Sequence, residues 1–299
     1  MNKFFNLVVA SAASLLILAG CGSNAAAPET TVTPDNNTSV EAPANPPADS
    51  NMENGSELDM ILDRGHILVG TMGDRPPFSY VASDGSYQGL DPFIARRLAL
   101  ELFGDENAVE FVETTAANRI PFLTSNRVDL ILASFTVTEE RAESVAFAEP
   151  YMTVYLGLLG PEGTTVSSLE DLKNGTVIVT TGSSSEIFFT MEHPEINILS
   201  FGQTTEAFAA MADGRGDAIA MDNSILFLPN EGLDVILPYI GGDSTIAPAV
   251  NLNSHALLDW VNDTMVNLRA EGFFEVAFTE TLEPAFIDGV TAEDIMILN

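Results

Sequence analysis

The sequence contains few cations. It has 11 lysines and arginines against 43 aspartates and glutamates, which gives a formal net charge of −32. Proteins that bind nucleic acid neutralise phosphates with lysine and arginine, so we expect no nucleic-acid partner. The acidity fits either a well-solvated surface or an adaptation to high salt or low pH, and the composition does not choose between these interpretations.

The sequence is also poor in residues that build metal centres and nucleotide sites. The three histidines, His66, His193 and His255, are dispersed, and a single cysteine excludes a thiolate metal cluster. The sequence has no Gly-x-x-x-x-Gly-Lys segment that could cradle phosphates. We therefore expect neither a metal nor another cofactor.

The one cysteine follows an apolar N-terminal run. Residues 7–19 are too few to span a bilayer, which takes roughly 20 residues, and they follow a short segment with one cation, Lys3. This pattern is typical of a secretory signal. The run ends in Leu-Ala-Gly-Cys, which is similar to the bacterial lipobox, so we predict a lipoprotein signal peptide at 1–20 and a lipid on Cys21. The alternative is a plain secretory peptide with a chance cysteine.

The segment 21–57 is rich in Ala, Pro, Asn, Thr and acids and has almost no large apolar residue. It cannot bury enough surface to offset its ordering entropy, so we predict a disordered tether. The lipid and the tether would hold the protein at the extracellular face of the cell membrane, or in the periplasm if the cell has two membranes. The remaining residues, 58–299, suffice for one large or two modest domains.

Short apolar runs alternate with amphipathic ones along 58–299. This alternation predicts an α/β fold with mostly parallel sheets. Ligands of such folds bind beyond the carboxyl ends of strands, so the loops after strands are the expected place for a site. The predicted strands are 66–72, 109–112, 128–133, 154–159, 177–180, 196–200 and 217–221, and the predicted helices are 91–103, 118–125, 184–191, 204–213 and 254–270.

Four loops after predicted strands carry polar residues suited to binding a small solute. Arg141 falls in the first turn of a helix capped by Thr138, where the helix dipole disfavours a cation, so a specific anion partner is expected. Gly182 permits a turn before a helix whose free N–H groups could bind an anion or polar group. Asp222 is an acid at the end of a strand. The four loops are 70–80, 133–141, 180–186 and 221–223.

Eight segments stand in an order and spacing that resemble one known family. The chain resembles the family 3 extracellular solute-binding proteins, the amino-acid receptors of ABC importers, over nearly everything after residue 60. Each segment alone is a weak signal, but the ordered set is a strong one. The segments are Gly70–Tyr80, Gln88–Asp91, Arg119–Leu123, Asp129–Arg141, Phe147–Tyr151, Asp171–Gly175, Thr181–Glu186 and Asp217–Asp222.

The resemblance implies a two-lobed periplasmic-binding-protein-like fold of type II, in which two mixed, mostly parallel sheets are joined by a two-strand hinge. Lobe 1 would comprise 58–153 and 246–299, and lobe 2 would comprise 154–245. The lobes would close on an amino acid or related small polar solute, which favours closure by contacting both. The protein would be a monomer that delivers this solute to ABC permease subunits, and it would not be an enzyme.

The resemblance also assigns roles to site residues. Arg141 would grip the ligand's α-carboxylate with its planar fork, assisted by Thr136 and Ser134. Ser184 would donate to the same carboxylate from the other lobe, and Asp222 would accept the α-ammonium group. More ordinary roles remain open: Arg141 could pair with Glu139 or Glu143, and Asp222 and Ser184 could cap helices.

The sequence departs from the family where the ligand's side chain would lie. Relatives often carry an aromatic residue at the position of Arg75 and another near Ala116, and several carry a polar residue at the position of Met72. Arg75 could pair with an acidic group of the ligand or point to solvent, whereas Met72 favours a less polar ligand. These indications conflict, so the sequence does not identify the ligand's side chain. Thr180, which ends the strand before the third loop, completes the candidate set.

Two other functions fit the same fold. The segment Thr71–Tyr80 is similar to the start of periplasmic cyclohexadienyl dehydratase, and Glu186 matches the position of that enzyme's catalytic acid. Plain receptors also carry Glu there, where it suits the first turn of a helix. A sensor or partner-binding domain is the other alternative.

Overall fold

The computed structural model describes residues 56–299. The predicted signal peptide, the predicted lipid site Cys21 and nearly all of the predicted tether lie outside the described residues. Ser56 caps the first helix, α1 (Glu57–Arg64), so Glu57 belongs to the folded part and not to the tether. Within the described part, no helix is long and apolar enough to cross a bilayer.

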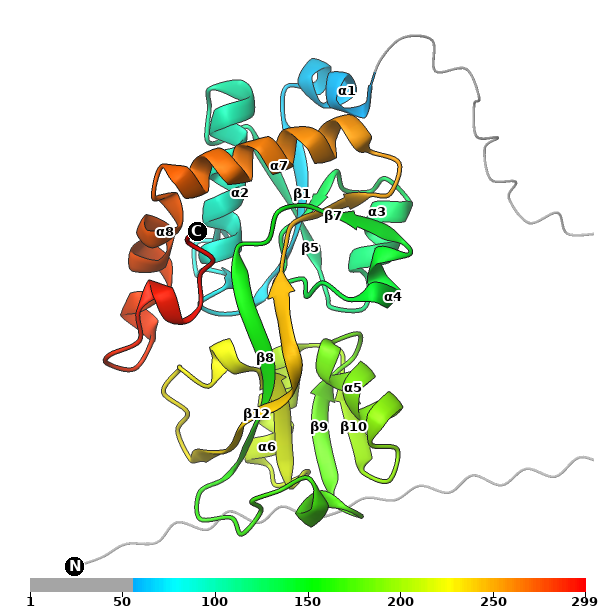
Figure 1. Cartoon of the computed structure of the whole chain (residues 1–299), viewed down its shortest axis with the longest axis vertical. Coiled ribbons are helices and arrows are strands. Elements are labelled where there is room, and N and C mark those ends of the chain that lie inside the picture. Colours follow the sequence, from blue (N-terminus) through cyan, green and yellow to red (C-terminus); the bar gives the residue numbers. More distant parts are fainter. Residues whose placement is uncertain (1–55) are drawn as a thin grey trace, which may run out of the picture. The chain divides into compact units, whose positions relative to one another are not determined.

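The first lobe is built on a five-stranded sheet (Figure 1). Its members are β1 (Ile67–Met72), β5 (Val109–Thr114), β6 (Leu130–Ile131), β7 (Val145–Phe147) and β13 (Ala249–Asn251), in the spatial order β5-β1-β6-β13-β7. β1 pairs in parallel with β5 and β6, whereas β13 pairs antiparallel with β6 and β7. Two segments that are distant in sequence therefore make one sheet. The main helices of this lobe are α2 (Leu90–Phe103), α3 (Arg119–Thr124) and α7 (His255–Ala270).

The second lobe is built on another five-stranded sheet, and one continuous segment supplies all of it. Its members are β8 (Met152–Pro161), β9 (Thr176–Thr180), β10 (Asn197–Phe201), β11 (Ala218–Asp222) and β12 (Leu233–Ile246), in the spatial order β10-β9-β11-β8-β12. β9 pairs in parallel with β10 and β11, and β8 pairs antiparallel with β11 and β12. Its helices are α5 (Ser184–Glu192) and α6 (Thr204–Ala212). The mixed α/β architecture is the predicted fold class.

Two long antiparallel strands, β8 and β12, connect the lobes (Figure 1). Their pairing begins where the chain leaves the first lobe, at Met152 opposite Ile246, and the register shifts at three places along β12. The predicted lobe boundaries, 153/154 and 245/246, fall near the start of β8 and the end of β12. We retain these exact boundaries as a proposal.

Several short elements were not predicted from the sequence. A three-stranded antiparallel sheet follows β1 and places Arg75 beside it. Most of these elements span only two or three residues, so their apolar periodicity is weak. They are β2 (Asp74–Arg75), β3 (Ser79–Val81), β4 (Tyr87–Gln88), α8 (Phe273–Thr281) and the 3-10 helices Glu170–Leu172, Asn223–Ile225, Glu283–Ala285 and Ala292–Asp294. The helix predicted after Thr138 is α4 (Glu139–Ala142).

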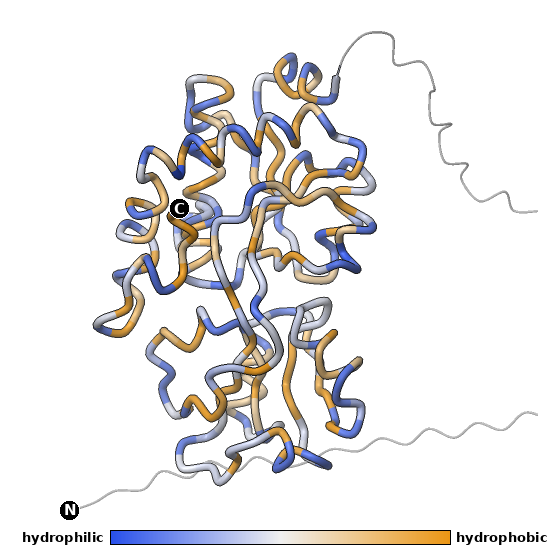
Figure 2. Tube along the Cα trace, in the orientation of Figure 1, coloured by the Kyte–Doolittle hydropathy of each residue, from blue (hydrophilic) through white to orange (hydrophobic). Residues whose placement is uncertain are grey.

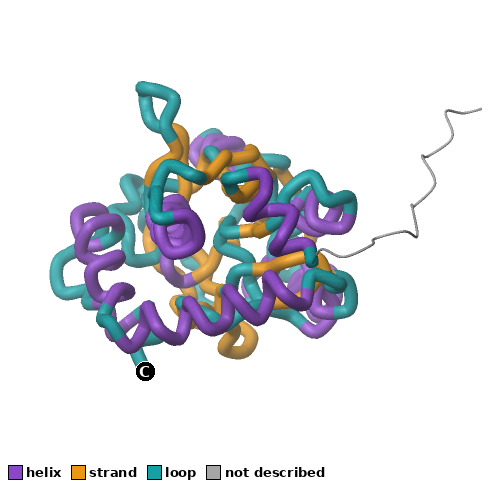
Figure 3. Tube along the Cα trace, turned by 90° about the horizontal axis from the view of Figure 1, so that it is seen from above, coloured by secondary structure: helices purple, strands orange, loops and turns teal. Residues whose placement is uncertain are grey.

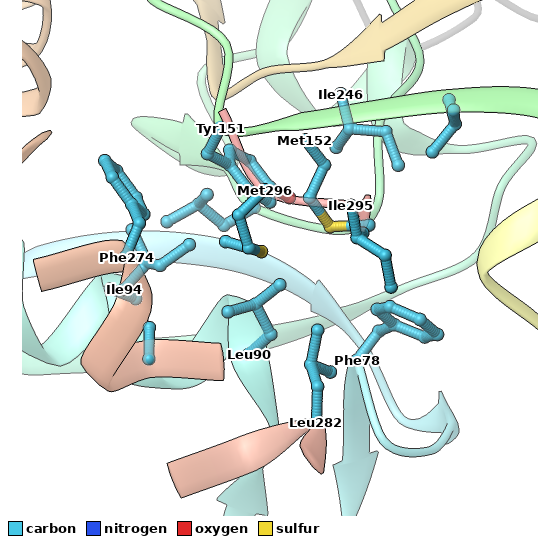
Figure 4. Close-up of a cluster of buried hydrophobic side chains, with 14 of the residues drawn as sticks. Phe78, Leu90, Ile94, Tyr151, Met152, Ile246, Phe274, Leu282, Ile295 and Met296 are labelled. Carbon is cyan, nitrogen blue, oxygen red and sulfur yellow. The ribbon is translucent and has the colours of Figure 1, made fainter. Parts of the chain in front are cut away.

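The hydrophobic core follows the sheets. Hydrophobic residues run along the strands, and hydrophobic and hydrophilic turns alternate along α7 (Figure 2). Seen from above, helices lie around the strands (Figure 3). The C-terminal residues Ile295 and Met296 pack with Tyr151 and Met152, and Met296 forms a β-bridge with Met152 (Figure 4). The end of the chain thus anchors the start of β8.

Candidate functional site

A small cavity lies between the two lobes, where strands of both sheets end. The first lobe lines it with residues of β2, of α3 and of the segments beside them, and the second lobe with the ends of β9 and β11 and the start of α5. The lining residues are Arg75, Ala116, Arg119, Ser134, Thr136, Thr180, Ser183, Ser184, Ser185, Ala220, Met221 and Asp222.

The structure brings six of the eight predicted ligand-binding residues to this cavity. Two do not line it. Arg141 lies beside it, in an adjoining groove, and its guanidinium contacts residues of the cavity wall. Met72 is 2% exposed and packs in a hydrophobic cluster that also contains Ala116. The six that line it are Arg75, Ser134, Thr136, Thr180, Ser184 and Asp222.

An ion pair joins the two walls of the cavity. Arg75 donates from Nη2 to Oδ2 of Asp222 over 2.5 Å, and the two side chains are only 10% and 6% exposed. Ser184 donates its hydroxyl to the other carboxylate oxygen of Asp222 over 3.3 Å. Arg75 therefore does not point to solvent, and the structure shows no side-chain capping bond from Asp222 to the following 3-10 helix. A carboxylate held this way can accept a cation.

Arg141 makes no ion pair with Glu139 or Glu143 in the described structure. It donates from Nη1 to the carbonyl of Thr136 over 2.7 Å and from Nη2 to the carbonyl of Gly182 over 3.0 Å. The second contact crosses from one lobe to the other. Burial lowers the pKa of Arg141, and the charge of Asp222 opposes this shift. The guanidinium thus remains free of a carboxylate partner, as an anion-binding arginine requires.

Arg119 is a functional candidate that sequence reasoning missed. It is 2% exposed and donates to the carbonyls of Ala116, Ala133, Ser134 and Gly182 at 3.1–3.3 Å. Burial and the charge of Arg141 lower its pKa well below the usual range. A signal existed: Arg119 opens a helix of otherwise apolar residues, and a cation in a first turn is disfavoured, which is the argument that identified Arg141.

The two arginines share an aromatic support and a carbonyl. Their guanidinium carbons lie 4.4 Å (Arg119) and 5.0 Å (Arg141) from the ring centre of Phe135. Stacking on a ring compensates part of the cost of burying a cation. Both also donate to the Gly182 carbonyl, so the loop before α5 is held by two cations of the opposite lobe.

Gly182 sits against the first lobe more closely than any side chain would allow. Its φ is +78°, and a Cβ there would lie 2.6 Å from the Cα of Ala117. A second contact between the lobes lies nearby, where Asp74 accepts from the backbone N–H of Thr204 at the start of α6 over 2.6 Å. Both contacts involve a backbone group of the second lobe and lie outside the cavity wall, so they bear on closure and not on recognition.

A buried polar cluster fixes Ser134 from behind. Ser134 has a φ of +46°, a strained conformation for a serine. Asp91 accepts from its backbone N–H over 2.8 Å and from the hydroxyl of Tyr151 over 2.5 Å. Burial raises the pKa of Asp91 to about 6, and these hydrogen bonds and the charge of Arg75 limit the rise. Asp91 thus positions Ser134 in the cavity wall, although Asp91 does not line the cavity itself.

The start of α5 supplies hydroxyls to the second wall. Ser183 caps the helix by accepting from the N–H of Glu186, which leaves Ser184 and Ser185 facing the cavity. Glu186 itself accepts from the N–H of Gly182 and from the hydroxyl of Ser200, each over 2.7 Å. Its carboxylate thus braces the loop, and Glu186 is not among the residues that line the cavity.

In residues 56–299, no three His, Cys, Asp or Glu side chains are grouped so that they could hold a metal ion. The cavity wall instead offers guanidinium groups, hydroxyls and one carboxylate. Such a wall complements a small molecule that carries both charges, with its anionic and cationic groups reaching opposite lobes.

Family and structural comparisons agree with this geometry. The model of the bacterial extracellular solute-binding proteins, family 3, matches residues 67–279, and the chain belongs to this family. Its fold is the type II periplasmic-binding-protein fold. As a member, it is a solute-binding protein for an amino acid, associated with an ABC transporter, and proteins of this family are extracellular or periplasmic.

Three relatives bear on the ligand. A cysteine-binding protein from Campylobacter jejuni is 43% identical, with a TM-score of 0.79, over 81% of this chain and 99% of that one. A solute receptor for L-cysteine from Neisseria gonorrhoeae is 42% identical, with a TM-score of 0.78, over 80% and 99%. A glutamine-binding protein from Geobacillus stearothermophilus is 34% identical over 75% of this chain and 82% of its own length. All three are binding proteins.

Proposed function

We propose that this protein captures L-cysteine for an ABC importer. The observation that carries the amino-acid part is the cavity itself, with cations on the wall of the first lobe and Asp222 with several hydroxyls on the wall of the second. One feature favours a small side chain: the wall has Arg75 where relatives often carry an aromatic residue, and Ala116 near the place of a second one. The likeness to two L-cysteine receptors supports the same ligand.

The proposed roles follow the positions of the groups. Asp222 accepts the ligand's ammonium group, since its carboxylate already accepts a cation from the cavity side. Arg141 holds the α-carboxylate together with Thr136 and Ser134, and Ser184 reaches it from the second lobe. Arg119 supports the same wall through its contacts with backbone carbonyls.

The remaining candidates concern the ligand's side chain. Arg75 and Thr180 line the cavity, and each has a buried polar atom without a hydrogen-bond partner among the described residues: Nε and Oγ1. We assign both to the side chain of the ligand. Met72 supports the wall from the hydrophobic cluster behind Ala116 and does not touch the ligand.

Binding is proposed to be coupled to closure about β8 and β12. The ligand favours the closed arrangement because it contacts groups of both lobes, and the contacts of Asp74 and Gly182 add to that preference. The protein works as a lipid-anchored monomer, attached through Cys21 and a tether that ends before α1, and presents the loaded lobes to the permease. The lipobox-like run supports this part of the proposal.

The test is a calorimetric screen of the twenty amino acids against the mature protein under reducing conditions. We expect L-cysteine to bind most tightly. Arg141→Met should abolish binding, because a buried guanidinium that holds a carboxylate is replaced by a side chain of similar length without charge. Arg127→Met is the matched control, since Arg127 is exposed and stacks on Phe122 outside the cavity.

Two results would contradict the proposal. If glutamine or another large amino acid binds far more tightly than cysteine, the ligand is wrong. If Arg141→Met retains full affinity while the Arg127→Met control does as well, the proposed carboxylate site is wrong.

A further inference from the structure

The charges around the cavity do not balance. Three guanidinium groups, of Arg75, Arg119 and Arg141, are buried at or beside the cavity, and the buried acids that act on them are Asp222 and Asp91. The guanidinium groups are close enough to repel one another, since the charges of Arg141 and Arg75 both lower the pKa of Arg119. Among the buried groups, three guanidinium cations face two carboxylates, which leaves one positive charge in excess.

Other charged groups of the packed elements do not remove this excess. The Asp74 carboxylate is bound to the N–H of Thr204, and Glu186 is bound to Gly182 and Ser200. The charge of Glu140 raises the pKa of Arg141, but Glu140 is exposed, so water and salt screen its charge. Tyr151 stays neutral because burial, with the charge of Asp91, raises its pKa well above the usual range. No histidine lines the cavity.

An amino acid with a neutral side chain adds no net charge, because its carboxylate and ammonium cancel. Binding it would leave the extra cation buried and uncompensated, which is unfavourable in a site of low polarity. The polar atoms without partners lie where the side chain is proposed to go: Arg75 Nε and Thr180 Oγ1 are both buried in the wall. Both can donate a hydrogen bond.

We propose that the ligand's side chain is bound as an anion against Arg75 and Thr180, so that the ligand carries a net charge of −1. This inference rests on the proposed function, and it specifies the ionisation state of the substrate. For L-cysteine the bound species is the thiolate: the S–H bond breaks, the electron pair stays on sulfur, and the proton leaves to the buffer. An amino acid with a side-chain carboxylate meets the same requirement without losing a proton.

Proton release is the direct test. Free cysteine is almost fully protonated at sulfur at pH 7, since an ordinary thiol has a pKa of about 8.5, and a neighbouring arginine lowers it. We expect close to one proton to be released per bound cysteine, measured by calorimetry in phosphate and Tris with a phosphine reductant. By linkage, the affinity should rise about tenfold per pH unit between about pH 6.5 and pH 8.

Comparator ligands separate the thiol from groups of the protein. L-Serine, L-alanine and L-2-aminobutyrate fill the same space without an ionisable side chain. If Asp91 were the source of the proton, these ligands would release it too. We expect them to bind at least about a hundredfold more weakly, with no proton release and little pH dependence.

Variants of Arg75 give a second readout. Arg75→Met should reduce proton release to below about 0.2 per site and bring cysteine and 2-aminobutyrate to within about fivefold of each other. Arg75→Lys restores the charge and should restore proton release. Arg96→Met is the matched control, because Arg96 belongs to the same lobe and does not line the cavity.

Each outcome decides something. Cysteine binding by the wild-type protein without proton release overturns the inference and leaves the proposed function intact. Tightest binding of L-aspartate contradicts cysteine as the ligand and supports the anionic side chain. Tightest binding of an amino acid with a neutral side chain overturns both.

Discussion

The two lobes contribute different chemistry to the same cavity. The first lobe supplies three guanidinium groups: Arg75 and Arg119 line the cavity, and Arg141 lies beside it. The Phe135 ring and backbone carbonyls support Arg119 and Arg141. The second lobe supplies hydroxyls at the start of α5 and one carboxylate, that of Asp222. Positive charge is thus concentrated in the first lobe, and the second lobe opposes it with the single carboxylate of Asp222. A ligand with both charges satisfies the two sides only when they meet.

Asp222 is the one carboxylate that the second lobe contributes to the cavity wall, so its substitution should have the largest effect. Asp222→Asn leaves Arg75 buried without its partner and removes the proposed acceptor for the ammonium group. We expect affinity to fall on the order of 1,000-fold, or about 4 kcal/mol, as for breaking a buried pair. Asp213→Asn, an exposed acid at the end of α6, is the calorimetric control. Unchanged affinity in Asp222→Asn would remove this residue from the site.

Asp91 tests how the first lobe carries its charges. Its pKa is raised from 3.8 to about 6 by burial, so the folded protein holds this proton more tightly than the unfolded chain does. The stability that Asp91 provides is complete below the unfolded pKa and is lost as pH rises through the folded value. Relative to wild type, Asp91→Asn should therefore gain about 3 kcal/mol between roughly pH 4 and pH 7.

Denaturant unfolding of both proteins across this pH range measures the difference. Asp263→Asn, an exposed acid on α7, should show no such trend. A constant gap between wild type and Asp91→Asn at all pH values would mean that Asp91 is ionised throughout.

Gly182 tests whether the lobes must meet this closely. Alanine there would place a Cβ 2.6 Å from the Cα of Ala117 in the opposite lobe. We expect Gly182→Ala to weaken ligand binding about 30-fold, or about 2 kcal/mol, because the closed arrangement is overpacked. Gly214→Ala is matched in backbone strain, with a φ of +71° and nothing within 4 Å of its Cβ. Equal ligand affinities in the two variants would show that binding does not require the lobes to approach each other this closely.

Asp74 is expected to have the smallest effect. Its carboxylate accepts from the first N–H of α6 across the lobes, so Asp74→Asn keeps an acceptor but loses the charge at a helix N-terminus. We expect a threefold loss of affinity, about 0.7 kcal/mol, with the order of ligand preference unchanged. Asp84→Asn in the exposed β3–β4 turn is the control. A change in ligand preference would place Asp74 in recognition instead.

Much of the fold was predictable from the sequence because it follows apolar periodicity. The strands around Val69 and Ile178 and the helix around Val261 are buried on the expected faces. What escaped prediction carries little periodic signal. β12 mixes exposed, half-buried and buried residues in an irregular order, and β2 is only two residues long. β13 supplies only three residues, and nothing local indicates that it lies between β6 and β7.

The candidate site was predictable where a residue contradicts its local context. Arg141 in a first helical turn and Asp222 at a strand end are such residues, and the structure places both at or beside the cavity. Met72 gave no local contradiction, and its side chain packs in a cluster instead. The pairing of Arg75 with Asp222 depends on two segments that are distant in sequence, so no pattern within either segment could reveal it.

The position of β13 between β6 and β7 in the first sheet has a consequence for folding. β7 pairs with β13 (Ala249–Asn251), which lies about a hundred residues further along the chain, so this pairing cannot form until both segments are in place. The second sheet comes from one continuous segment, so its contacts close shorter loops. We therefore expect the second lobe to form first and the first lobe to be the slower, later step, because non-local strand pairing limits folding rates.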